Sequence, residues 1–173
     1  MNNNFFFPSK RSSIDNFKVM QLLSDANLLE KKGMDIYHLE LGEPQSKTPL
    51  KVKNEVKKLL KLNLPGYTPS NGIIELRKSI SDFYNVKYNL KVPKDNIFIT
   101  TGSSGAFLLS FLVCFDPGQK IGIFSPVYPA YRNILKSLNL KVIEINPLRN
   151  KIENLNINGL RDIEGLSGLI ISN

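Results

Sequence analysis

The sequence has few of the residues on which disulfide scaffolds and metal centres depend. Its 173 residues include one cysteine, one histidine and no tryptophan. A single cysteine cannot form an internal disulfide bond, which excludes a disulfide-stapled fold and favours a reducing compartment. The sequence also has no group of His and Cys residues at metal-ligand spacing, so no metal site is predicted. We therefore expect a cytoplasmic protein without a metal ion.

Long apolar runs are also missing. The longest, residues 106–115, is interrupted by Ser110, and it is half as long as the roughly 20 apolar residues that a membrane-spanning helix needs. Phe5, Phe6 and Phe7 form a run that is too short for the apolar core of a secretion signal. The sequence therefore predicts neither a membrane partner nor a targeting segment.

Acidic residues are too few to balance the basic ones. The chain has 23 Lys and Arg residues against 15 Asp and Glu residues, which gives a net charge of +8. Of the basic residues 18 are Lys, and they are spread along the whole chain rather than gathered in one patch. We therefore predict a solvated, Lys-rich surface and no nucleic-acid partner. The 42% of hydrophobic residues suffice for a folded core, which excludes an intrinsically disordered protein.

Helices dominate the pattern of the N-terminal half. Apolar positions recur at helical spacing over residues 14–32, and Gly33 follows where a helix would end. Residues 36–41 are predicted to be extended. A second helix is predicted from Thr48-Pro49 to about residue 62. Its apolar positions are expected to face inward: Leu50, Val52, Val56, Leu59 and Leu60. A loop rich in Pro and Gly at residues 64–72 precedes a third helix over residues 73–84.

Strands and helices alternate in the C-terminal half. Strands are predicted at residues 97–101, 121–124, 141–145 and 168–172. Helices are predicted at residues 103–115 and 129–138, and a polar helix or loop at residues 153–162. Continuously apolar strands separated by helices indicate a parallel sheet that is covered on both faces. The sequence therefore predicts an α/β fold, a three-layer α/β/α domain with a mostly parallel sheet and an N-terminal helical segment.

A segment of small residues follows the first predicted strand. Ligands of open parallel sheets bind at the carboxyl ends of the strands. Thr101-Gly-Ser-Ser-Gly-Ala106 occupies such a position and leads into a helix, whose first-turn amide groups favour a phosphate. The same residues could equally form only a capped turn. They match neither the Walker loop nor the dinucleotide-binding fingerprint.

Aromatic side chains follow the next predicted strand. Ser125-Pro-Val-Tyr-Pro-Ala-Tyr131 contains two prolines and presents Tyr128 at the edge of the sheet. The ring of Tyr128 could stack on a planar ligand or pack in the core. Tyr67, in the loop rich in Pro and Gly, is either a surface residue or a hydroxyl donor. We interpret His38 as structural and Cys114 as an inert core residue.

The order of these motifs resembles a known family. Phe17-Lys-Val-Met20 is followed by Gly33-Met-Asp-Ile-Tyr-His-Leu-Glu-Leu-Gly-Glu-Pro44, and then by Tyr67-Thr-Pro-Ser-Asn-Gly72 with Glu75-Leu-Arg77. Thr101-Gly-Ser-Ser104, Asp116-Pro-Gly118 and Ser125-Pro-Val-Tyr-Pro-Ala-Tyr131 continue the series. This ordered set resembles the N-terminal half of the class I/II aminotransferases, which have fold type I and depend on pyridoxal 5'-phosphate.

The resemblance implies a role for six residues. Gly42 would bring its backbone against the substrate carboxylate, and Tyr67 would reach the cofactor phosphate of the other subunit of a homodimer. Gly102, Ser103 and Ser104 would form the phosphate-binding cup. Tyr128 would stack on the pyridine ring of the cofactor, which favours the stacking interpretation over core packing. The substrates would be an amino acid and a 2-oxo acid.

The resemblance also implies that catalytic residues lie beyond the C-terminus. Ile170-Ile-Ser-Asn173 resembles the start of a family segment that continues Pro-Asn-Asn-Pro-Thr-Gly. The Schiff-base Lys, the ring-contacting Asn and Asp, and the substrate-binding Arg of the family follow that segment. None of the 18 Lys residues has the matching context, so no catalytic residue is assigned and the chain alone is expected to be inactive.

The predicted domains are incomplete for the same reason. Residues 1–45 would form an N-terminal segment, a helix and a short strand, that belongs to the small domain or the interface. Residues 46–173 would form the first part of the large cofactor-binding domain, truncated at its C-terminal side.

Three interpretations stay open at this point. The first is part of an aminotransferase of amino acid metabolism, with a biosynthetic role, or of another enzyme of the same fold, such as a C–S lyase, a decarboxylase or a synthase. The second is a non-catalytic, truncated remnant. The third is an unrelated α/β module that binds phosphate or a nucleotide.

Overall fold

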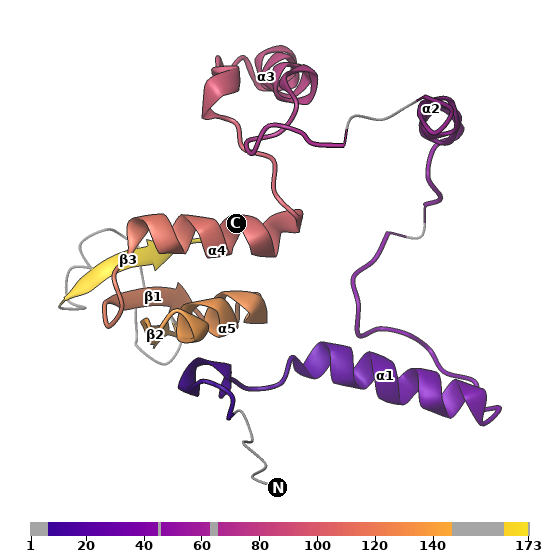
Figure 1. The fold of residues 1–173 in the computed structure, drawn as a ribbon. Helices are drawn as coiled ribbons and strands as arrows, with labels where there is room; N and C mark the ends of the chain where they lie inside the picture. The colour runs from indigo at the N-terminus through magenta and orange to yellow at the C-terminus, as the bar shows by residue number, and fades with distance from the viewer. Residues whose placement is uncertain (1–6, 45, 63–65, 147–164, 173) are drawn as a thin grey trace, which may run out of the picture. The chain divides into compact units, whose positions relative to one another are not determined.

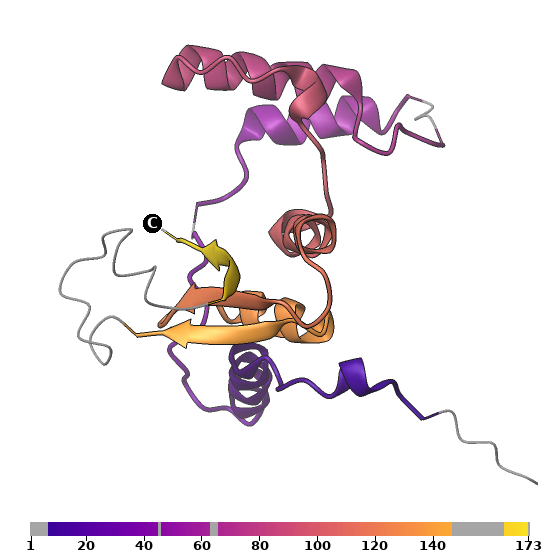
Figure 2. The same cartoon turned by 90° about the vertical axis from the view of Figure 1, so that its left-hand side faces the viewer.

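The computed structural model describes residues 7–44, 46–62, 66–146 and 165–172 (Figures 1 and 2). The chain divides into two compact units, one formed by residues 1–38 with residues 102–173 and the other by residues 39–101. The predicted boundary at residue 45 divides the chain differently and stays a prediction. The described helices are all too short or too polar to cross a membrane.

The first unit contains a sheet of three parallel strands. Its described elements are η1 (Lys10–Ser12), α1 (Lys18–Lys31), α4 (Gly102–Cys114), β1 (Lys120–Phe124), α5 (Pro129–Ser137), β2 (Lys141–Ile145) and β3 (Leu166–Ile170). The strand order is β2-β1-β3, and Gly122 at the centre pairs with Ile143 on one side and Leu169 on the other. The predicted α/β class and its parallel sheet are confirmed. The helix or loop predicted at residues 153–162 lies outside the described residues.

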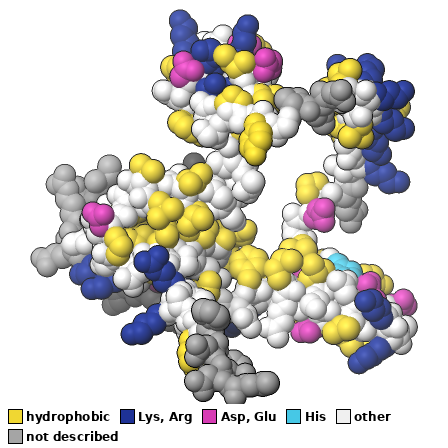
Figure 3. Space-filling model, viewed as in Figure 1, with side chains coloured by type: hydrophobic (Ala, Val, Ile, Leu, Met, Phe, Trp, Pro, Cys, Tyr) yellow, Lys and Arg dark blue, Asp and Glu magenta, His cyan; other side chains and the backbone are white. Residues whose placement is uncertain are grey.

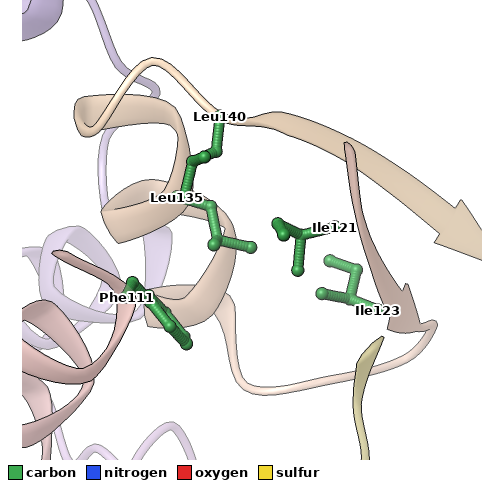
Figure 4. Close-up of a cluster of buried hydrophobic side chains, with 5 residues drawn as sticks. All are labelled: Phe111, Ile121, Ile123, Leu135 and Leu140. Atoms are coloured by element: carbon green, nitrogen blue, oxygen red, sulfur yellow. The ribbon is translucent and has the colours of Figure 1, made fainter. Parts of the chain in front are cut away.

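The core of this unit lies between β1 and the helices α4 and α5. Five buried side chains form it: Phe111, Ile121, Ile123, Leu135 and Leu140 (Figure 4). Ile121 and Ile123 come from the same face of β1, because successive side chains of a strand alternate between its faces. The glycine between them leaves room for neighbouring side chains, since a Cβ atom at Gly122 would lie 2.8 Å from Cδ1 of Leu169 and displace it.

The second unit is helical in its described part. It contains α2 (Leu50–Leu59), α3 (Ile74–Tyr88) and η2 (Lys94–Asn96). Arg77 of α3 is buried and donates hydrogen bonds to the carbonyl oxygens of Gly72 and Lys94. The hydroxyl group of Ser81, one turn further along α3, donates to the carbonyl oxygen of Val92 at 2.6 Å. These bonds hold the segment that follows α3 against the helix.

Two predicted strands are wrong. Residues 36–41 and 97–101 form no strand. A strand needs a neighbour for its amide and carbonyl groups, and the described sheet pairs only β1, β2 and β3. The amide of Ile99 donates instead to the carbonyl oxygen of Asn71 at 3.2 Å. The apolar sequence of these segments suits a strand, but it does not show whether a partner strand is present.

Two burial predictions are also wrong. The apolar positions of α2 are exposed, from 48% at Val56 to 71% at Leu50, and no other described element packs extensively against this helix. Cys114 is exposed as well. The partly or fully buried rings of α4 and the turn after it, Phe107, Phe111 and Phe115, recur every four residues. Cys114 lies beside that stripe rather than on it.

Candidate functional site

The predicted phosphate cup lies in the first turn of α4. Gly102, Ser103 and Ser104 begin this helix, and all three are exposed. Gly102 has a φ of +76°, and a Cβ atom there would meet nothing within 4 Å, so backbone conformation rather than space requires glycine. The first turn carries no acidic residue. The helix dipole and the first-turn amides therefore favour an anion, and no carboxylate of this turn opposes it.

Tyr128 stands at the N-cap position of α5, just after the loop that leaves β1. Its side chain is 46% exposed, so it is not a core residue. The ring packs edge-to-face with Tyr131 at a centroid distance of 5.6 Å. A second edge-to-face contact joins it to Phe17 at 6.1 Å. Two neighbouring rings thus hold Tyr128 while nearly half of its surface stays accessible.

The first turn of α4 and the start of α5 lie at the same end of the sheet (Figure 1). Helix α4 ends just before residues 115–119, which lead to the start of β1. The first turn of α4 is the other end of the helix, so it lies toward the carboxyl end of β1. Tyr128 follows the same strand end. Phe107 of α4 packs edge-to-face on Tyr131 of α5 at a centroid distance of 4.7 Å, which fixes this juxtaposition. The structure therefore brings Ser103 and Ser104 to the strand end that Tyr128 follows.

The other two predicted site residues belong to the unit formed by residues 39–101. Gly42 is exposed in an irregular segment, and its Cα is free of neighbours that a side chain would meet. Tyr67 is 99% exposed. Their roles toward the substrate and the cofactor phosphate stay predictions.

Sequence reasoning missed the segment that packs beside Tyr128. Between residues 15–21 and the first turns of α5 lies an open cavity of about 570 Å³, lined by Asp15, Lys18, Arg132 and Asn133 among others. Phe17 contacts Tyr128 at one side of this region. The apolar spacing of residues 14–32 identified Phe17 only as a helix position. Phe17 and Tyr128 are more than 100 residues apart in the sequence, and the spacing of apolar residues around Phe17 does not predict a contact between them.

Two described lysines of this unit lie at the opposite end of the sheet, and a third, Lys18, lines the cavity beside the first turns of α5. Lys120 and Lys141 are the first residues of β1 and β2 and pair with each other in the strand register. They therefore lie at the amino ends of the strands, opposite to the end that Tyr128 follows. Lys136 pairs with Asp15 at 3.1 Å. In the ranges that the structure describes, His, Cys, Asp and Glu side chains form no group of three that could hold a metal ion.

Sequence and structure comparisons agree on the class of protein that the chain resembles. The family described as "Aminotransferase class I and II" matches residues 35–165. The valine–pyruvate aminotransferase of Mycobacterium tuberculosis is 40% identical over 135 residues, which cover 78% of this chain and 35% of that protein. The (5-formylfuran-3-yl)methyl phosphate transaminase of Methanocaldococcus jannaschii is 39% identical, over 76% of this chain and 35% of that protein.

Solved structures show the same relationship. The crystal structure of an aminotransferase from Mycobacterium tuberculosis aligns with a TM-score of 0.87 at 35% identity, over 96% of this chain and 43% of that one. The aspartate aminotransferase of Thermus thermophilus with maleate shares the fold at 23% identity, with a TM-score of 0.86. The chain thus spans about a third of the length of the curated relatives and corresponds to their N-terminal part. On this evidence the chain belongs to the class I and II aminotransferase family.

Proposed function

We propose that the protein serves pyridoxal-phosphate-dependent amino transfer between an amino acid and a 2-oxo acid. The observation that carries this proposal is the juxtaposition of Ser103 and Ser104, in the first turn of α4, with the half-exposed ring of Tyr128. An anion-binding helix start beside an accessible aromatic ring suits a ligand that combines a phosphate with a planar ring. Membership of the aminotransferase family supports the same ligand.

The residues of the first turn of α4 fit the phosphate of this cofactor. The turn is exposed, lacks acidic side chains and begins with a glycine at positive φ. In this proposal Gly102, Ser103 and Ser104 bind the phosphate, and Tyr128 stacks on the pyridine ring. When bound, the cofactor supplies an electron sink for the negative charge that develops at the α-carbon of the amino acid.

Gly42 and Tyr67 have proposed roles as well. The backbone of Gly42 would contact the substrate carboxylate, and its lack of close neighbours supports an approach by a ligand. Tyr67 would reach the cofactor phosphate of a second subunit, and its 99% exposed side chain is free for such a contact. This assignment implies a homodimer. We also propose a cytoplasmic location, supported by the single unpaired cysteine.

The names of the relatives support the substrate class rather than one substrate. They include a valine–pyruvate aminotransferase, several aspartate aminotransferases and a transaminase of a furan methyl phosphate. The side chains that these substrates carry differ in charge and shape. We therefore propose an amino acid and a 2-oxo acid as the substrate class, within amino acid metabolism and its biosynthetic branch.

We further propose that the 173-residue chain does not transfer amino groups by itself. A transaminase needs a lysine that binds the cofactor covalently and moves the proton at the α-carbon. Lys120 and Lys141 lie at the end of the sheet opposite to Tyr128, and Lys136 forms an ion pair with Asp15. None of these three is placed for that role, and none of the chain's 18 lysines has the sequence context of the family's Schiff-base lysine.

The phosphate cup is tested by Ser103→Asp, with Ser110→Asp as the matched control on the same helix. Pyridoxamine phosphate is the probe, because it lacks the aldehyde that would react with surface lysines. The new carboxylate of Ser103→Asp would repel the phosphate, so we expect at least a tenfold loss of affinity in a fluorescence titration. The same carboxylate favours the helix dipole, so the melting temperature should not fall. Ser110→Asp, two turns further, should bind as the unchanged chain does.

Two results would contradict the proposal. Equal affinities for the unchanged chain and Ser103→Asp would remove the phosphate cup from the first turn of α4. Turnover of valine and pyruvate by the chain with pyridoxal phosphate, followed by amino acid analysis, would disprove the absence of a catalytic lysine. We expect no turnover.

A further inference from the structure

The segment before α1 runs beside the start of α5 and contacts it at three points. We call residues 10–17 the strap. At one end η1 packs against α5. In the middle Asp15 accepts hydrogen bonds from two α5 side chains, through its carbonyl oxygen from Asn133 at 3.3 Å and through Oδ2 from Lys136 at 3.1 Å. At the other end Phe17 meets Tyr128 at a centroid distance of 6.1 Å. The strap thus follows α5 toward its N-terminus and ends on the ring of Tyr128.

The contact between Phe17 and Tyr128 restricts the orientation of the Tyr128 ring. The two ring planes are inclined by 81°, which is the edge-to-face geometry that aromatic pairs prefer. Tyr131 makes the same kind of contact at an inclination of 86°. Edge contacts with two neighbours favour this orientation of the ring, because other orientations of its plane would weaken one of them. The two contacts therefore favour one orientation for the surface of Tyr128, 46% of which stays exposed.

The strap is held by interactions that can be broken without unfolding the core. Asp15 and Lys136 have side-chain exposures of 75% and 43%, and ion pairs between such exposed groups contribute little to stability. The cavity of about 570 Å³ beside the strap shows that it does not pack closely along its whole length. None of the strap residues belongs to the hydrophobic core. A change in the strap should therefore act on Tyr128 without acting on the fold.

We propose that Phe17 is a positioning residue for Tyr128, and that Asp15 fixes Phe17 in place by binding Lys136 and Asn133. Phe17 holds the Tyr128 ring in the orientation in which its exposed surface receives the planar ring of the cofactor. The identity of the ligand in this inference rests on the proposed function. The positioning of Tyr128 by Phe17 rests on the contacts of the strap. The inference adds Phe17 and Asp15 to the six residues to which the motif order gives a role.

The contact itself is tested without any ligand. In the 173-residue chain with isotope-labelled tyrosine, the ring signals of Tyr128, assigned with Tyr128→Leu, should shift in Phe17→Leu and broaden because the ring becomes mobile. Phe17→Tyr keeps an aromatic ring edge and should restore a single sharp position. Asp15→Lys should shift the same signals by a smaller amount, because the carbonyl oxygen of residue 15 still accepts from Asn133. The charge-reversed pair Asp15→Lys with Lys136→Asp should restore the signals. Unchanged Tyr128 signals in Phe17→Leu would overturn the positioning role.

The consequence for the ligand is tested with pyridoxamine phosphate. We expect Tyr128→Leu to weaken binding tenfold or more, Phe17→Leu to weaken it about three- to tenfold, and Phe17→Tyr to bind as the unchanged chain does. A merely structural role of Phe17 would lower the melting temperature of Phe17→Leu and leave the affinity unchanged, which would overturn the inference. If Tyr128→Leu and the unchanged chain bind equally well, or if neither binds, the proposed stacking is wrong and the positioning role falls with it. The ring signals test the contact between Phe17 and Tyr128 separately from ligand binding.

Discussion

Arg77 is the one charged residue of the described chain that is buried, with an exposure of 7%. Its Nε atom donates to the carbonyl oxygen of Gly72 and its Nη1 atom to that of Lys94, both at 3.2 Å. A buried charge is costly unless it is hydrogen-bonded, and these bonds join the loop before α3 to η2 after it. The motif Glu75-Leu-Arg77 contributed to the family resemblance, but it did not predict that Arg77 joins these two segments. Two acceptors of Arg77 are backbone groups that only the fold brings near, and its Nη1 atom also donates to Oδ1 of Asp95 at 3.4 Å.

At the residue scale we predict that Arg77→Met destabilises the chain. The change leaves the carbonyl oxygens of Gly72 and Lys94 without this donor, which should lower the free energy of unfolding by about 1–3 kcal/mol. Urea denaturation followed by circular dichroism measures the loss. Lys78→Met, an exposed neighbour on the same helix, is the control and should change stability by less than about 0.5 kcal/mol. Equal stabilities of the two variants would contradict the structural role of Arg77.

The elements of the first unit were predictable where both the local sequence and the tertiary contacts favoured the same structure. Strand β2 was predicted at its observed bounds, and β1 and β3 within two residues. Each is an apolar run with a partner in the sheet. Residues 97–101 are equally apolar and form no strand. A helix satisfies its backbone groups internally, whereas a strand depends on a neighbour that its own sequence does not encode.

At the element scale we predict that Gly122→Ala weakens the packing of the sheet. The added methyl group would lie 2.8 Å from Cδ1 of Leu169 and 3.1 Å from Cδ1 of Ile145. Overpacking of this kind costs about 1–3 kcal/mol, measured as a loss of stability in urea. Gly66→Ala is the control, because nothing lies within 4 Å of a Cβ atom there. A neutral Gly122→Ala would mean that β1 and β3 are not packed as closely as described.

At the scale of the whole molecule, much apolar surface is exposed on the described chain. Helix α4 is apolar almost all round, a pattern typical of a buried helix. Its side chains Leu109, Leu112 and Val113 are nevertheless 55–86% exposed, and hydrophobic atoms gather over this helix in Figure 3. Exposed apolar surface promotes association. The net charge of +8 opposes it, because copies of the chain repel one another.

We therefore predict that salt promotes self-association of the 173-residue chain. Raising the ionic strength from about 0.01 M to about 0.1 M shortens the screening length from about 30 Å to about 10 Å, which weakens the repulsion and leaves the apolar attraction. Light scattering should show larger particles at the higher salt concentration. Val113→Lys should reduce association more than Ser110→Lys, which adds the same charge without removing an apolar side chain. Association that decreases with salt would instead indicate ion pairs between copies.

The sequence by itself determined the helices, the three paired strands and the order of motifs that leads to the family. These features are local, because each depends on spacing within a few turns of chain or on short runs of particular residues. Only the tertiary structure decided which apolar faces are buried, that Arg77 caps two backbone carbonyls, and that Phe17 lies on the ring of Tyr128. Such contacts join residues far apart along the chain. They arise from packing, which local periodicity does not encode.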